Sequence, residues 1–110
     1  MRLKPGVRLL GIRPETWAIA LAADPLWLAA GVAGGVMISS CTEGVHMRAS
    51  PHYLGCAVDL RVSDLPAWIS REAVRSQLAD ALGADFDVLL EYVGTPNEHL
   101  HGEFDPKTPY

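Results

Sequence analysis

The stretch Cys56-Ala57-Val58-Asp59-Leu60-Arg61-Val62 decides the fold class, because apolar and polar side chains alternate along it. This period of two predicts a strand. The short apolar run Val36-Met37-Ile38 predicts an earlier, buried strand. Residues 39–55 between them are rich in Ser, Gly, Thr and His, which predicts a loop.

A helix is expected after the strand over residues 56–62. Ser70 is a suitable N-cap, and Ile69 and Val74 have the spacing of a hydrophobic staple. The apolar stripe continues from Val74 through Leu78 to Leu82. Gly83 then predicts the end of the helix.

The C-terminal part predicts two strands, Phe86 to Tyr92 and Leu100 to Phe104. The sequence Gly94-Thr95-Pro96-Asn97 between them is typical of a turn. Two consecutive strands joined by a turn indicate an antiparallel pair.

The N-terminal part predicts helix over residues 14–23, with Pro14 in its first turn and Glu15 near its positive end. Asp24-Pro25 has the pattern of a new cap followed by an N1 proline. We therefore expect a second short helical piece that runs to Ala30 and ends at Gly31.

These elements predict an α+β fold, with a small antiparallel sheet and flanking helices, in one domain over residues 1–110. The formal net charge of −4 argues against a nucleic-acid partner. Asp24-Pro25 interrupts the apolar stretch 17–38, so stable membrane insertion is not expected. The first residues lack a signal-peptide pattern, which predicts synthesis in the cytoplasm without a signal peptide. We expect a monomer.

All four histidines fall in two short segments that also carry acidic residues. His52, Asp59 and His101 supply the three nitrogen and oxygen ligands that a catalytic zinc site needs. Glu98 is then free to act as general base, with Glu91 as the rival for that role.

The order of residues is compatible with a site that groups these side chains. A turn at Gly55 can bring His52 towards Asp59, and His99, His101 and Glu103 alternate, so a strand places them on one face. The alternative for His99 is an ordinary strand residue. His46 is interpreted as a loop residue because three better ligands are present.

Two motifs carry a resemblance to a known family. Ser50 to Asp59 matches Ser-x-His-x-x-Gly-x-Ala-x-Asp, and Glu98 to Phe104 matches Glu-x-x-His followed by an acidic and an aromatic residue. Together they resemble the zinc D,D-carboxypeptidase and L-alanyl-D-glutamate endopeptidase family, which shares the hedgehog-like fold. The segments 4–7 and 11–15 are similar to small phage and prophage members.

The resemblance implies one Zn²⁺ per chain, held by His52, Asp59 and His101. It implies Glu98 as the base and His99 as a group beside the metal that assists the transition state. The implied reaction is hydrolysis of an amide bond in a peptidoglycan stem peptide, with a zinc-activated water as the nucleophile.

One departure concerns substrate binding. Many members carry an Arg before the first histidine, in a segment that here reads Ser39-Ser40-Cys41-Thr42-Glu43-Gly44. Arg48 and Arg61 are the candidates to replace it. The missing Arg keeps a second hypothesis open, a non-catalytic zinc-containing module for cell-wall binding or virion structure. A third hypothesis is a hedgehog-like interaction domain with structural zinc.

The expected place of action follows from the expected function. A cytoplasmic wall-degrading enzyme needs a holin-type partner that releases it through the membrane. Otherwise the protein would be associated with the virion.

Overall fold

The computed structural model describes residues 1–42 and 55–107, in which two helices accompany one sheet. The strands are β1 (Arg2–Leu3), β2 (Met37–Ser40), β3 (Ala57–Arg61), β4 (Phe86–Glu91) and β5 (His99–Phe104). The helices are α1 (Pro14–Ala29) and α2 (Arg71–Leu82). The predicted α+β class is confirmed.

The sheet has the strand order β1-β2-β3-β5-β4. The pairs β2–β3, β3–β5 and β4–β5 are antiparallel, as the sequence predicts. The sheet as a whole is mixed, because β1 pairs with β2 in parallel. The expected antiparallel arrangement holds for these three pairs and is wrong at the β1 edge. Strand β1 has only two residues, which are too few to show an alternation pattern in the sequence.

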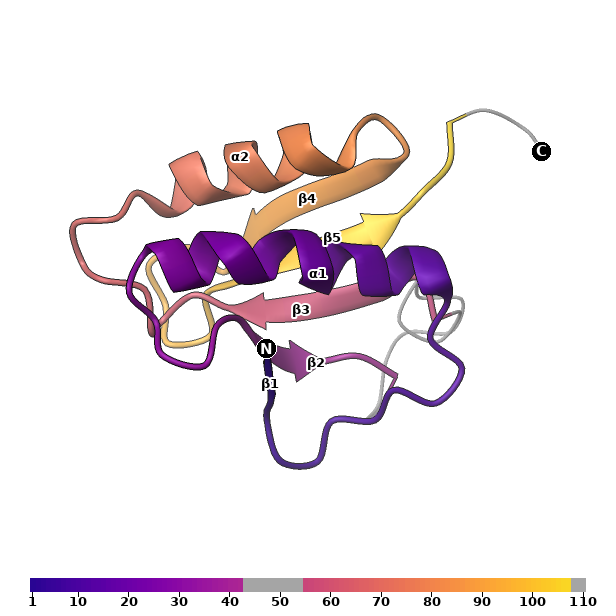
Figure 1. Ribbon diagram of the computed structural model, residues 1–110, viewed down its shortest axis with the longest axis horizontal. Helices are drawn as coiled ribbons and strands as arrows, with labels where there is room; N and C mark the ends of the chain where they lie inside the picture. The colour runs from indigo at the N-terminus through magenta and orange to yellow at the C-terminus, as the bar shows by residue number, and fades with distance from the viewer. Residues whose placement is uncertain (43–54, 108–110) are drawn as a thin grey trace.

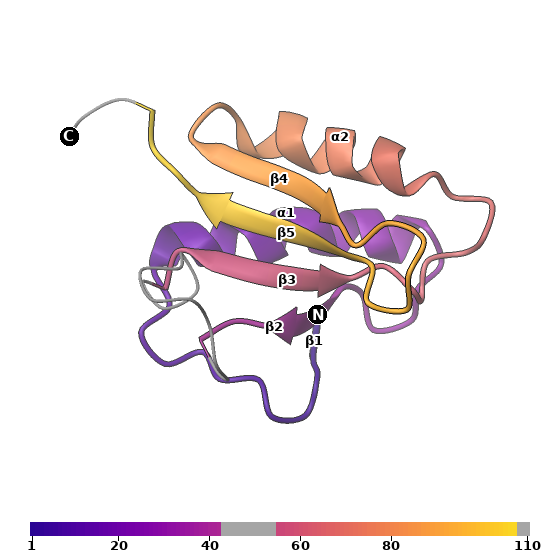
Figure 2. The same ribbon diagram turned by 180° about the vertical axis from the view of Figure 1, so that it is seen from behind.

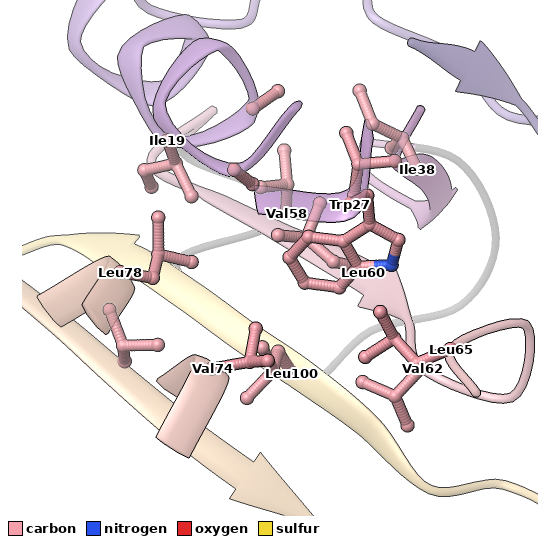
Figure 3. Close-up of a cluster of buried hydrophobic side chains, with 14 of the residues drawn as sticks. Ile19, Trp27, Ile38, Val58, Leu60, Val62, Leu65, Val74, Leu78 and Leu100 are labelled. Carbon is pink, nitrogen blue, oxygen red and sulfur yellow. The ribbon is translucent and has the colours of Figure 1, made fainter. Parts of the chain in front are cut away.

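Both helices cover the same face of the sheet, and among the described residues no helix or strand covers the opposite, open face (Figures 1 and 2). The core lies between these two layers (Figure 3). Ile19 and Trp27 of α1 meet Val58 and Leu60 of β3, and all four side chains are fully buried. The even-numbered residues of β3 and β5 thus point to the helices, so the odd-numbered residues lie on the open face.

Helix α1 is continuous through Asp24 and Pro25, so the predicted break is wrong. The Asp24 carboxylate does not cap a new helix. It accepts a hydrogen bond from the Val36 backbone N–H at 3.0 Å and pairs with the Met1 amine at 3.0 Å. Beyond Pro25, the buried Trp27 donates its indole N–H to the Arg61 carbonyl at 3.1 Å. Tertiary contacts therefore hold the helix where local signals predict its interruption.

Helix α2 begins and ends as predicted. The Ser70 hydroxyl accepts a hydrogen bond from the Ala73 N–H at 3.1 Å, and Gly83 has a φ of 90° at the C-cap. Val74 and Leu78 are the buried residues of this helix.

Gly55 precedes β3, and its hydrogen bonds hold this end of the strand against the start of α1. Its carbonyl accepts hydrogen bonds from the Arg13 N–H at 3.0 Å and from the buried Thr16 hydroxyl at 2.7 Å. A Cβ at position 55 would lie 2.2 Å from the Gly11 carbonyl oxygen, and φ is +73°. Only glycine fits this junction. Within the described ranges, no helix has both the length and the apolar character needed to cross a membrane.

Candidate functional site

The open face of the sheet carries a patch of ionisable side chains in cross-strand register. Arg61, His99 and Glu91 form one row across β3, β5 and β4. The next row contains Asp59 and His101. Directly opposite residues on one face of an antiparallel pair have side chains within contact distance. The topology thus gathers these groups although they lie far apart in the sequence.

The central contact of the patch joins Asp59 and His101, both predicted metal ligands. Asp59 Oδ1 and His101 Nδ1 are 3.0 Å apart. The side chains are 15% and 10% exposed, respectively. The Asp59 carboxylate is thus largely buried, and the His101 imidazole stabilises it there.

His101 lies between two carboxylates. Its second ring nitrogen, Nε2, is 3.0 Å from Glu103 Oε1. Burial lowers the pKa of His101, but the hydrogen bond and charge of Asp59, then Glu103 and Glu91, together raise the pKa from 6.5 to about 9. The metal-free protein therefore holds an imidazolium at this position at neutral pH.

His99 is near the other carboxylate oxygen of Asp59, Oδ2. Its Nδ1–H donates to the Asn97 carbonyl at 2.7 Å, while Nε2 lies 3.2 Å from Glu91 Oε1 and 3.7 Å from Asp59 Oδ2. Ligand atoms of Asp59, Glu91 and His99 all lie within 4.8 Å of one another. These three groups can also hold a cation, and a histidine oriented by a backbone carbonyl is common among metal ligands.

A hollow of about 120 Å³ opens beside His99. Glu98, the predicted base, lines this hollow together with His99 and Arg61. Glu98 precedes β5 directly, so it lies at the edge of the patch rather than in a row of the sheet.

The remaining predicted ligand, His52, lies outside the described residues, as do His46, Ser50 and Arg48. Two of the three predicted ligands, Asp59 and His101, are thus brought together. The predicted groups Glu98 and His99 share one adjoining hollow. An imidazole and a carboxylate in contact are a donor set that suits zinc.

Sequence reasoning missed two carboxylates as partners of the histidines. The sequence predicts that Glu103 shares a face with His99 and His101 and that Glu91 is a rival base, but it does not predict the contacts of these carboxylates with the histidines. The cross-strand register of Glu91 with His99 is the signal that would have found this contact, but it depends on the turn between the strands.

A second acidic group on this face comprises Asp87, Glu103 and Asp105. The Lys107 ammonium lies 3.1 Å from Asp87 and 2.9 Å from Asp105, so a side-chain cation already compensates these charges. This group therefore gives no reason to expect a second metal.

Comparisons with known proteins give no family assignment: no family model matches the chain, and neither a curated protein nor a solved structure does.

Proposed function

We propose that this protein is a zinc-dependent peptidase that hydrolyses an amide bond in peptidoglycan stem peptides. The observation that carries the proposal is the contact between Asp59 and His101 on the open face. Each residue belongs to one of the two sequence motifs, and the register of β3 and β5 brings the two motifs together. The resemblance of these motifs supplies the substrate class.

In this proposal His52, Asp59 and His101 hold the zinc ion. When bound, zinc would lower the pKa of a water molecule and polarise the scissile carbonyl group. Asp59 and His101 are already close together without the ion, and binding of zinc by His101 would release the proton that the imidazolium carries.

Glu98 would act as general base, taking a proton from the attacking water and passing it to the leaving amine. Its place in the hollow beside His99 supports this role. Glu91 is the alternative base, because its carboxylate lies 3.2 Å from His99 Nε2. His99 would stabilise the negative charge that develops on the carbonyl oxygen.

Glu98→Gln and Glu91→Gln form a matched pair of variants that separates these roles. We expect Glu98→Gln to retain zinc and to lose about 100-fold or more of the activity on purified muropeptides, as loss of a general base does. Glu91→Gln should retain most of the activity. Full activity in Glu98→Gln, with loss in Glu91→Gln, would transfer the base assignment to Glu91.

A second candidate function is a zinc-containing module that binds the cell wall, or serves in a virion, without catalysis. The absence of Arg from Ser39 to Gly44 favours it, because a family group that holds substrate is then missing. Peptidoglycan that is bound by the zinc-loaded protein without release of new amine groups would support this candidate.

The proposed cellular context follows from the substrate. Action on the wall would require a holin-type release partner or delivery within a virion. Lysis by the protein co-expressed with a membrane-permeabilising protein, but not by the protein alone, is the expected result for the first route.

A further inference from the structure

The helix layer, on the side of the sheet away from the candidate site, contains two helices of different character. Helix α2 exposes polar side chains such as Glu72 and Asp80, as a helix at the surface of a monomer does. Helix α1 instead exposes Leu21, Pro25 and Leu28, which lie on one face at helical spacing. A helix that is apolar on all sides is normally buried on all sides. The outer face of α1 is therefore an apolar surface that calls for a partner.

A groove opens beside this face, between the end of α1 and the start of α2, which lie at the same end of the molecule (Figure 1). Its volume of about 280 Å³ is about nine times the roughly 30 Å³ that one water molecule occupies in the liquid. The groove therefore has room for a large aromatic side chain. It suits an apolar occupant, because no charged side chain is among the described residues that line it, which are Leu26, Ala29, Ala30, Ile69, Val74 and Gln77.

Trp68 lies in the loop before α2, and its side chain is 83% exposed. The loop itself is firmly held. The Arg71 guanidinium donates hydrogen bonds to the backbone carbonyl groups of four loop residues, which are Val62, Leu65, Pro66 and Ile69. The protein thus presents an indole ring to solvent from a fixed loop. Because the loop is already ordered, binding through Trp68 costs little additional conformational entropy.

Trp68 and the groove are neighbours, because Trp68 directly precedes Ile69, which lines the groove. A protruding side chain beside a hollow that can receive it makes a surface self-complementary. A two-fold axis next to this surface would place each Trp68 in the groove of the other copy. Such a contact closes on itself, so it would give a dimer rather than an open chain of molecules.

Charge also favours a second copy as the occupant. With a net charge of −4, two copies repel each other unless the surfaces that meet carry little charge. The charged residues of α1 are Glu15, in its first turn, and Asp24, which is partly buried and accepts a hydrogen bond from the Val36 N–H. Helix α1 contains no Lys or Arg, the residues with which interfacial helices bind anionic lipid. The surface therefore suits an uncharged protein surface better than a membrane.

The area that such a contact would bury matches a small but specific interface. An inserted indole ring buries about 150–250 Å² of its own surface and covers a comparable area of the groove. The two symmetric insertions would thus bury about 600–1,000 Å² in total. Leu28, which is exposed next to the groove residue Ala29, would add to this area. The sum approaches the roughly 1,200 Å² at which stable protein interfaces begin.

We propose that two copies of this chain form a symmetric dimer through the helix layer, with Trp68 of each copy in the groove between α1 and α2 of the other. This inference does not depend on the proposed peptidase function, and it replaces the monomer expected from the sequence. The candidate site lies on the opposite face of the sheet, so both copies keep it accessible. Two such sites would bind a polymeric ligand with higher avidity than one site does.

Sedimentation equilibrium of the full chain over a range of protein concentrations tests the dimer. The wild-type protein should pass from monomer to dimer as its concentration rises. Trp68→Ala should raise the dissociation constant about 30-fold or more, as for loss of a binding hot spot. Leu10→Ala is the matched control, because it also removes a strongly exposed apolar side chain and should leave the constant unchanged. A wild-type protein that stays monomeric up to about 1 mM would overturn the proposal.

A mixture of two variants tests the proposed geometry. Ala29→Arg blocks the groove but keeps Trp68, so it should prevent dimer formation as Trp68→Ala does. Mixed together, the two variants retain one intact contact, between the indole of one copy and the free groove of the other. They should therefore form heterodimers at concentrations at which each variant alone is monomeric. If the mixture stays monomeric where the wild-type protein is dimeric, the geometry is refuted.

Thermal unfolding shows whether each variant is folded, and Gln77→Arg blocks the same groove from α2 if Ala29→Arg does not fold. Vesicles of phosphatidylcholine and phosphatidylglycerol test the membrane as the alternative occupant. A dimeric wild-type protein that does not bind these vesicles would support the proposal. Vesicle binding that requires Trp68, by a protein that forms no dimer, would assign the surface to a membrane and overturn it.

Discussion

Asp59 lies between two histidines: Oδ1 is 3.0 Å from His101 Nδ1, and Oδ2 is 3.7 Å from His99 Nε2. The register of β3 against β5 creates this arrangement, because Asp59 is directly opposite His101 and Arg61 is opposite His99. A single carboxylate thus belongs to two candidate ligand sets. Variants of the two histidines can therefore decide which set binds metal.

The first prediction concerns metal content. We expect about one zinc per chain in the wild-type protein, a clear loss in His101→Ala, and retention in His99→Ala, because His101 is the proposed ligand. Elemental analysis of protein purified without added metal measures this. The opposite pattern, with loss only in His99→Ala, would assign the metal to the group formed by Asp59, Glu91 and His99.

The second prediction concerns pH and the stability of the metal-free protein. The pKa of His101 is raised from 6.5 to about 9 by its carboxylate neighbours, against the effect of burial. Between these two values the folded state binds more protons than the unfolded state, so stability falls as pH rises. The contribution is fully present below about pH 6.5 and is lost as pH rises through about 9, with an upper size of about 3 kcal/mol.

Denaturant unfolding at several pH values in the presence of a chelator measures this dependence. His101→Gln is the control, since it removes the titrating group and should flatten the decrease. A wild-type stability that does not fall relative to this variant between pH 6.5 and 9 would contradict the prediction.

The third prediction concerns the packing of α1 on β5. A Cβ at Gly102 would lie 2.7 Å from Cγ2 of the fully buried Ile19. Overpacking of this kind costs about 1–3 kcal/mol, so Gly102→Ala should lower the free energy of unfolding by that amount. Chemical denaturation gives the value.

Ile19→Leu provides a partner variant, because leucine has no branch at Cβ and so lacks the methyl group that the new Cβ would meet. The double variant should lose less stability than the two single variants together. Strict additivity would show that the steric conflict lies elsewhere.

The sequence predicts the parts of this fold that local chemistry controls. Helix α2 carries its own start and stop signals, Ser70 and Gly83, and both act as expected. Strand β3 shows alternation along its own residues. By contrast, the parallel pairing of Arg2 with Met37 depends on contacts between distant segments, and no short pattern encodes it.

The candidate site likewise contains contacts that the sequence predicts and contacts that it does not. Asp59 and His101 are predictable as a pair because each lies in a recognisable motif. The contact of Glu91 with His99 depends on how the turn between β4 and β5 sets the register, which sequence alone does not fix. Likewise, Asp24-Pro25 has the local pattern of a helix start, yet the hydrogen bond from Val36 overrides it.

The two-layer architecture separates the positions that govern folding from those that govern chemistry. Along β3 and β5 every second residue packs under the helices, and the residues between them lie on the opposite face of the sheet. Substitutions at Arg61, His99 or Glu103 would thus change what the face recognises while leaving the helix-packed layer intact. In evolution, or in a designed library, such a scaffold can acquire a new ligand or reaction while its core residues, and so its fold, stay the same.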